Sequence, residues 1–168
     1  MTNKGEINMF TRRRTLLLGA GAAALAASGA SAFIFGRGVE EGQIFTIDGI
    51  AIRGTDPVAY FTEGQPVAGS AEFAHDWAGA TWHFASAENR DLFVADPEAY
   101  APAYGGYCAW AVAARGSLAT TQPENWAIVD GRLFLNFNDD VQARWDEDRA
   151  AFIEEGDRRW PEVIAANS

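Results

Sequence analysis

Residues 73–84 read FAHDWAGATWHF. Aromatic or imidazole rings recur at every second position before and after a small Ala-Gly pair, which is the alternation expected of two β-strands. A two-residue turn at this pair places His75 opposite Trp82 and gathers the large aromatic side chains on one face. The stretch therefore predicts an antiparallel hairpin in which His75 and His83 lie on opposite faces.

Two Asp-Gly pairs elsewhere in the chain predict two further hairpins. Each pair separates two apolar runs, and Asp-Gly is typical of the two-residue type I′ turn, in which both residues adopt positive φ. The pairs are Asp48-Gly49, between residues 44–47 and 50–52, and Asp130-Gly131, between residues 126–129 and 132–137.

Helices are expected between and after these hairpins. Ser86 is a suitable N-cap for a helix that stops before Pro97, and residues 107–114 form a short apolar helix. Asn138 caps a longer C-terminal helix with an apolar stripe. Two residues near the end of this helix are expected to break or bend it, Gly156 and Pro161. Hairpins mixed with helices predict an α+β domain, with a small antiparallel sheet packed against short helices and the C-terminal helix.

The N-terminus has the features of a twin-arginine (Tat) export signal. Arg12 and Arg13 precede an apolar run over residues 16–27, which is shorter than the roughly 20 residues that span a bilayer. Ala30 and Ala32 form a small-x-small site for a signal peptidase. These features predict export by the Tat machinery to the periplasm. An ordinary secretory signal and an uncleaved anchor are the alternatives.

This interpretation divides the chain into three parts. Residues 1–32 are the signal peptide, residues 33–42 a linker and residues 43–168 one domain. The 168 residues carry 13 Lys and Arg against 23 Asp and Glu, a formal net charge of -10. Such a charge argues against nucleic acid and anionic membrane surfaces as partners.

Four motifs follow one another from residue 54 onward: Gly54–Phe61, Trp82–Ser86, Asp96–Tyr100 and Tyr104–Val112. In residue types and in order, they resemble the YHS-domain family, in particular its longer exported branch. The resemblance implies an accessory protein associated with metal handling and no particular reaction. Short members often carry two cysteines at the positions of Ala85 and Asn89, so that presumed metal site is absent from this chain.

Cys108 is the most distinctive candidate for chemistry. It follows Gly105-Gly106 and is expected in the first turn of a helix, where free amide groups and the helix dipole favour a thiolate. A thiolate could serve as a redox group, a nucleophile or a metal ligand. The alternative is a small buried apolar residue, the usual state of a free Cys.

Two other sets of residues are candidates for binding. His75 and His83 with Cys108 would make a His2Cys set for a transition metal such as zinc or copper, although packed histidines without metal are the alternative. Four aromatic residues could line a ligand pocket near the thiol, or simply pack in the core. They are Tyr60, Tyr104, Tyr107 and Trp110.

Three functions remain open from the sequence. The favoured one is a periplasmic binding or accessory protein that handles a metal ion or a small ligand near Cys108. The second is a thiol-dependent redox protein or enzyme, and the third is a non-catalytic module that binds a partner protein. A non-enzymatic role is favoured over catalysis because the sequence contains no motif that names a reaction.

Overall fold

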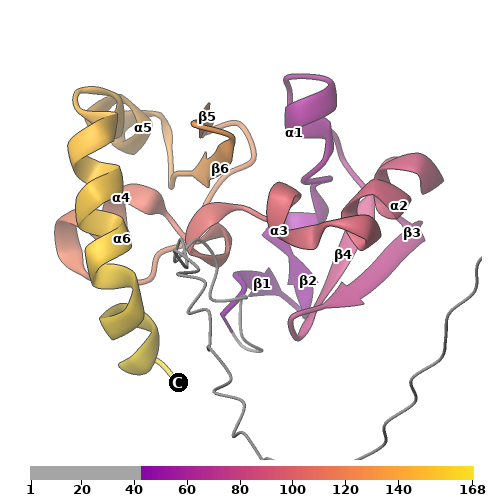
Figure 1. Ribbon diagram of the computed structural model, residues 1–168, viewed down its shortest axis with the longest axis horizontal. Coiled ribbons are helices and arrows are strands. Elements are labelled where there is room, and N and C mark those ends of the chain that lie inside the picture. The colour runs from indigo at the N-terminus through magenta and orange to yellow at the C-terminus, as the bar shows by residue number, and fades with distance from the viewer. Residues whose placement is uncertain (1–42) are drawn as a thin grey trace, which may run out of the picture. The chain divides into compact units, whose positions relative to one another are not determined.

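A computed structural model describes residues 43–168, and all of them fall within one compact unit. The predicted signal peptide (1–32) and linker (33–42) lie outside the described residues. In Figure 1, helices α4, α5 and α6 gather on one side and strands β1–β4 with α2 on the other, with β5 and β6 between them. No helix of the described part is long and apolar enough to cross a membrane.

The larger sheet has four strands in the order β1-β2-β4-β3. They are β1 (Thr46–Ile47), β2 (Ile50–Ala51), β3 (Ser70–Trp77) and β4 (Ala80–Phe84). Its two hairpins are antiparallel, as predicted, but β2 and β4 pair in parallel. The parallel pairing arises because the Thr81 amide donates to the Gly49 carbonyl at 2.9 Å and docks the first hairpin on β4.

The register of the aromatic hairpin is the predicted one. His75 pairs with Trp82, and the register is irregular only nearer the start of β3. Ala78 and Gly79 have φ values of 51° and 74°, so the turn is left-handed at both residues, as a two-residue hairpin requires. The two histidines therefore alternate to opposite faces of the sheet.

The last hairpin forms a separate two-stranded sheet of β5 (Trp126–Val129) and β6 (Arg132–Leu135). The predicted single sheet is thus two sheets. Side chains of β6 explain the separation, because Leu133 and Leu135 pack in one core cluster while Phe134 packs in the other. A strand whose alternate residues enter two cores lies between them and is covered on both faces.

The shorter helices and turns are η1 (Ile52–Gly54), α1 (Ala59–Thr62), α2 (Ala87–Ala95), α3 (Pro97–Tyr100) and η2 (Ala103–Gly106). The predicted cap of α2 is confirmed, since Ser86 Oγ accepts a hydrogen bond from the Asn89 amide at 3.1 Å. Helix α4 (Ala109–Arg115) begins two residues later than predicted. Tyr104 and Gly105 adopt positive φ in η2 and delay the helix, so Cys108 is its N-cap instead of a first-turn residue.

The predicted C-terminal helix is two helices, α5 (Asp139–Asp146) and α6 (Arg149–Ala165). Asn138 caps α5 as predicted, but Asp148 leaves the helical conformation, with φ -154° and ψ 73°, and caps α6 by accepting from the Ala151 amide at 3.1 Å. Gly156 and Pro161 were expected to break or bend the helix, and the break does not occur, because both residues lie inside α6. The break comes at Asp148 because its side chain caps a new helix there.

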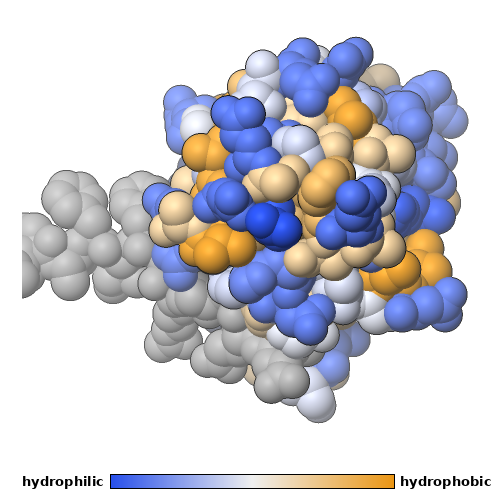
Figure 2. All heavy atoms as spheres, turned by 90° about the vertical axis from the view of Figure 1, so that its right-hand side faces the viewer, coloured by the Kyte–Doolittle hydropathy of each residue, from blue (hydrophilic) through white to orange (hydrophobic). Residues whose placement is uncertain are grey.

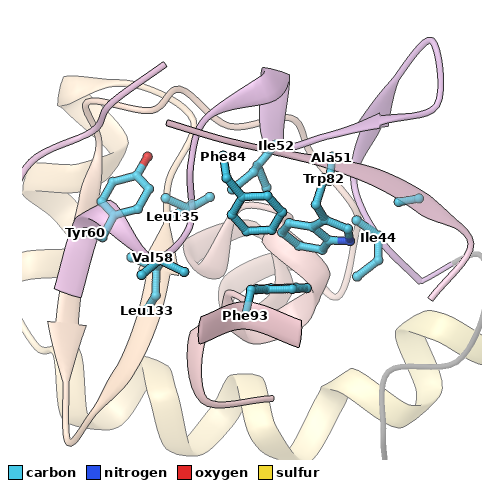
Figure 3. Packing of buried hydrophobic residues seen from close by; sticks show 11 residues of the cluster. Ile44, Ala51, Ile52, Val58, Tyr60, Trp82, Phe84, Phe93, Leu133 and Leu135 are labelled. Atoms are coloured by element: carbon cyan, nitrogen blue, oxygen red, sulfur yellow. The ribbon is translucent and has the colours of Figure 1, made fainter. Parts of the chain in front are cut away.

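Two apolar clusters stabilise the domain. The first lies between the larger sheet, α2 and β6, and Figure 3 shows Trp82, Phe84 and Phe93 stacked at its centre. The second joins η2, α4, β6 and α5 through Tyr104, Phe134 and Trp145, among others. Several candidate site residues lie in these two clusters or pack against them.

Candidate functional site

The Cys108 thiol lies in the core, with 1% of the residue exposed. Its Sγ donates to Asn136 Oδ1 at 3.5 Å. Burial raises the pKa of the Cys108 thiol, against the opposing effect of nearby backbone N–H groups. The helix start therefore does not produce the activated thiolate that the sequence suggested, because removing the sulfur from water disfavours its charged form.

Asn136 is the group that holds this thiol in place. It is fully buried at the end of β6, and its Oδ1 also accepts a hydrogen bond from the Trp110 amide at 3.0 Å. Its Nδ2 donates to Gln142 Oε1 at 3.0 Å, and so joins α4 to α5. Both ends of the amide are used for structure, so Asn136 has no free polar atom for a substrate.

The three proposed metal ligands are not brought together. His75 and His83 lie on opposite faces of the β3–β4 hairpin, and Cys108 lies at the start of α4. Within residues 43–168, no group of three or more His, Cys, Asp or Glu side chains could hold a metal ion. The predicted His2Cys set therefore does not form, because the hairpin register separates its histidines.

The four candidate pocket aromatics do not line one cavity. Tyr60 belongs to the first core cluster and Tyr104 to the second. Tyr107 lies between the rings of Phe45 and Trp160, at 5.7 Å and 6.5 Å from their centroids. Two shallow surface depressions, of about 320 and 600 Å³, are lined by other residues. The packing alternative describes the positions of the three tyrosines.

Both buried tyrosine hydroxyls are engaged in hydrogen bonds. Tyr60 Oη donates to the Pro123 carbonyl at 2.9 Å, and Tyr104 Oη donates to Asp157 Oδ1 at 2.9 Å. Asp157 also forms a two-pronged ion pair with Arg132 at 2.8 Å for each contact. Desolvation raises the pKa of both tyrosines, and Asp157 raises that of Tyr104 further. The hydroxyls are therefore neutral donors that join distant segments.

Asp56 is an organising residue of the domain. It is fully buried, and its Oδ1 accepts from the Val58 amide at 2.8 Å and the Ala59 amide at 3.3 Å. Its Oδ2 accepts from the Ala85 amide at 2.8 Å and from Asn89 Nδ2 at 2.7 Å. The Asp-Pro sequence before α1 signals a capping role, but no spacing rule reveals a partner in α2.

This arrangement does not fit the metal that the family resemblance implies. The two positions at which short members carry cysteine are Ala85 and Asn89, which offer an N–H group and an amide NH2 to Asp56. Both are hydrogen-bond donors without a lone pair for a cation, and the carboxylate is saturated by four such donors. No metal-dependent step can be derived from these residues.

Comparison with known proteins gives one match. The YHS domain family matches residues 58–104, which run from the N-terminal end of α1 into η2 and include the aromatic hairpin, α2 and the Asn89 contact. No curated protein and no solved structure matches the chain. The remaining described elements extend the same compact unit on both sides of the matched segment: β1, β2 and η1 precede it, and α4 to α6 follow it. Residues 58–104 of this chain are therefore a YHS domain.

Proposed function

We propose that this protein is a Tat-exported, periplasmic accessory protein that acts by binding a partner protein and performs no covalent chemistry. One observation carries the proposal: the side chains of Cys108, Tyr104 and Asp56 are each already hydrogen-bonded within the described domain. The Cys108 thiol donates a hydrogen bond to Asn136, and the Tyr104 hydroxyl donates one to Asp157. The Asp56 carboxylate accepts four hydrogen bonds from N–H groups of the domain. Groups held in this way stabilise a scaffold and have little capacity left for a substrate.

The other two functions receive less support from the same geometry. A thiol-dependent enzyme requires an accessible sulfur of low pKa, whereas burial raises the pKa of Cys108. Metal handling requires converging ligands, and the residues 43–168 do not provide a cluster of them. Partner binding requires only a folded surface, which the domain has.

Export as a folded protein supports this interpretation. The Arg12-Arg13 pair, the short apolar run and the site at Ala30 and Ala32 are features of a Tat signal. The Tat route carries folded proteins, so the domain would reach the periplasm with its binding surface already formed. A rigid preformed surface also lowers the entropic cost of association.

The decisive experiment is chemical cross-linking in intact producing cells, followed by purification of the protein under denaturing conditions. We expect a discrete cross-linked product in the periplasmic fraction. The matched control is the Arg12→Lys/Arg13→Lys variant, which should stay in the cytoplasm and lose the product. A protein that reaches the periplasm and yields no specific product at any cross-linker length would contradict the proposal.

A further inference from the structure

Two arginines converge on one tryptophan at the surface formed by α4 and α5. The guanidinium carbon of Arg115 lies 4.9 Å from the centroid of the Trp110 ring, and that of Arg144 lies 5.9 Å from it. Trp110 is half-buried, whereas both arginines are exposed. Each guanidinium is within the range of a cation–π contact with the indole.

These arginines differ from the others of the described domain in having neither an acidic partner nor a hydrogen bond. Of the other six arginines in residues 43–168, five pair with carboxylates, and the sixth, Arg53, donates to the Thr121 carbonyl. Within residues 43–168, neither Arg115 nor Arg144 has a carboxylate oxygen within 4.0 Å or donates a hydrogen bond. In a chain with 23 acids and 13 basic residues, two unpaired arginines on one ring are a departure from the general pattern.

Contact with the indole affects what these arginines can bind. A guanidinium held over an aromatic face keeps its N–H edge free, and a planar fork of N–H groups matches a carboxylate with two parallel hydrogen bonds. The contact also restricts the side chain before any ligand arrives, which reduces the entropy lost on binding. Two such groups beside one ring suit a ligand with more than one carboxylate.

An exposed apolar residue follows the residue that contacts the Trp110 backbone. Phe137 is 43% exposed and is one of the exposed large hydrophobic residues of the described domain. It directly follows Asn136, whose Oδ1 accepts the Trp110 amide hydrogen bond at 3.0 Å. A ligand that pairs with the arginines would meet the part-exposed indole of Trp110, and Phe137 lies one residue beyond the Asn136 contact.

Other apolar surface of the domain offers no comparable combination. Leu92 and Val94 of α2 are exposed, but residues two apart on a helix do not face the same way. Figure 2 shows the side of the domain that carries α2, and there the most hydrophobic areas are separated by hydrophilic residues. The part-exposed Trp110 ring of α4 differs from these residues because two unpaired arginines, Arg115 and Arg144, lie beside it.

We infer that Trp110, Arg115, Phe137 and Arg144, here called the Trp110 surface, bind an acidic segment of the partner protein that has an apolar side chain among its carboxylates. Charge complementarity selects the acidic groups, and the half-buried indole together with the exposed Phe137 ring selects the apolar one. The two depressions described above begin beside this surface, at Gly116 and at Asn138, and both are shallow, so an extended segment fits the surface better than an enclosed small anion. That the segment belongs to a protein rests on the proposed function.

The test uses the exported protein and a fluorescent peptide of alternating glutamate and leucine. We expect saturable binding by anisotropy, which weakens with added salt, and no binding of a peptide with glutamine in place of glutamate. The Arg115→Gln/Arg144→Gln variant should bind about tenfold more weakly or worse, because two charge-assisted contacts are lost. Arg158→Gln, an exposed arginine paired with Glu155, is the matched control and should bind as the unchanged protein does.

Two results would overturn the inference: no salt-sensitive binding of the glutamate peptide, or equal affinity in the double variant and the Arg158→Gln control. The cross-linking experiment separates this failure from failure of the proposed function. A periplasmic partner captured equally by the unchanged protein and the Arg115→Gln/Arg144→Gln variant would leave the proposed function standing and place the interface elsewhere. A partner lost only in that variant would support both.

Discussion

Asn89 Nδ2 donates to Asp56 Oδ2 at 2.7 Å, and this bond joins residues 33 positions apart in the chain. Through the same carboxylate, the start of α1, the end of β4 and the first turn of α2 are fixed to one another. The YHS domain of this protein is thus held at that corner by a buried carboxylate and its donors. Each of these donors would lose its partner if the carboxylate were removed.

Replacing the Asp56 carboxylate should be among the most damaging single changes in the domain. We expect Asp56→Ala to lower the free energy of unfolding by about 3 kcal/mol, because several buried N–H groups lose their acceptor at once. Asn89→Ala, which removes one donor, should cost about half as much. Urea unfolding followed by circular dichroism measures both changes.

The matched control is Asp76→Ala, which removes a carboxylate that accepts one exposed hydrogen bond, from Thr81 Oγ1 at 2.7 Å. We expect this variant to stay within about 0.5 kcal/mol of the unchanged protein. Equal losses for Asp56→Ala and Asp76→Ala would contradict the organising role of Asp56.

Cys108 should resist alkylation while the protein is folded. Burial blocks access and raises the pKa of the thiol, so the reactive thiolate is scarce at pH 8. We expect a thiol reagent to label the native protein at least about a hundredfold more slowly than the protein in guanidinium chloride. An exposed cysteine introduced by Thr120→Cys in a Cys108→Ala background should react rapidly in the native state. Comparable rates at the two positions would restore the thiol-dependent hypothesis.

The position of Gly156 in α6 depends on Tyr104. A Cβ atom at residue 156 would lie 2.5 Å from Tyr104 Oη and 2.8 Å from its Cζ. Gly156→Ala should therefore destabilise the protein by about 2 kcal/mol, although alanine is the better helix former. Thermal unfolding of Gly156→Ala with and without Tyr104→Phe tests the cause, since losing the hydroxyl should relieve part of the cost. A stabilising Gly156→Ala would show that α6 is free to shift.

Alkaline pH should unfold the protein through its buried tyrosines. Folding raises the pKa of Tyr60 and Tyr104 above the ordinary value of 10.0. The two tyrosines therefore contribute fully to the free energy of unfolding below pH 10, and this contribution is lost as the pH rises above 10. Each group should reduce the free energy of unfolding by roughly 1.4 kcal/mol per pH unit in that range.

Urea titrations between pH 9 and pH 11 measure this slope. The Tyr60→Phe/Tyr104→Phe variant should have a flatter profile above pH 10, although it is less stable at neutral pH because two hydrogen bonds are lost. The same slope in both proteins would show that these hydroxyls do not titrate on unfolding.

The local elements of the fold were predictable because neighbouring residues decide them. All three hairpin turns, the cap at Ser86 and the cap at Asn138 follow from short-range rules for turns and helix ends. The start of α4 and the boundary at Asp148 were missed. At the first place Tyr104 adopts positive φ, and at the second Asp148 leaves the helical conformation. The residue types at these positions do not require either conformation, so contacts within the folded chain select it.

Alternation and turn chemistry within a few residues were enough to predict the α+β class and the hairpin register that separates His75 from His83. The order of the motifs was enough to indicate the YHS segment. The folded chain was needed to find that Cys108 is buried, that Asp56 contacts Asn89, and that Arg115 and Arg144 both contact Trp110. Burial and pairing between distant residues depend on how elements pack, and packing is set by the whole core.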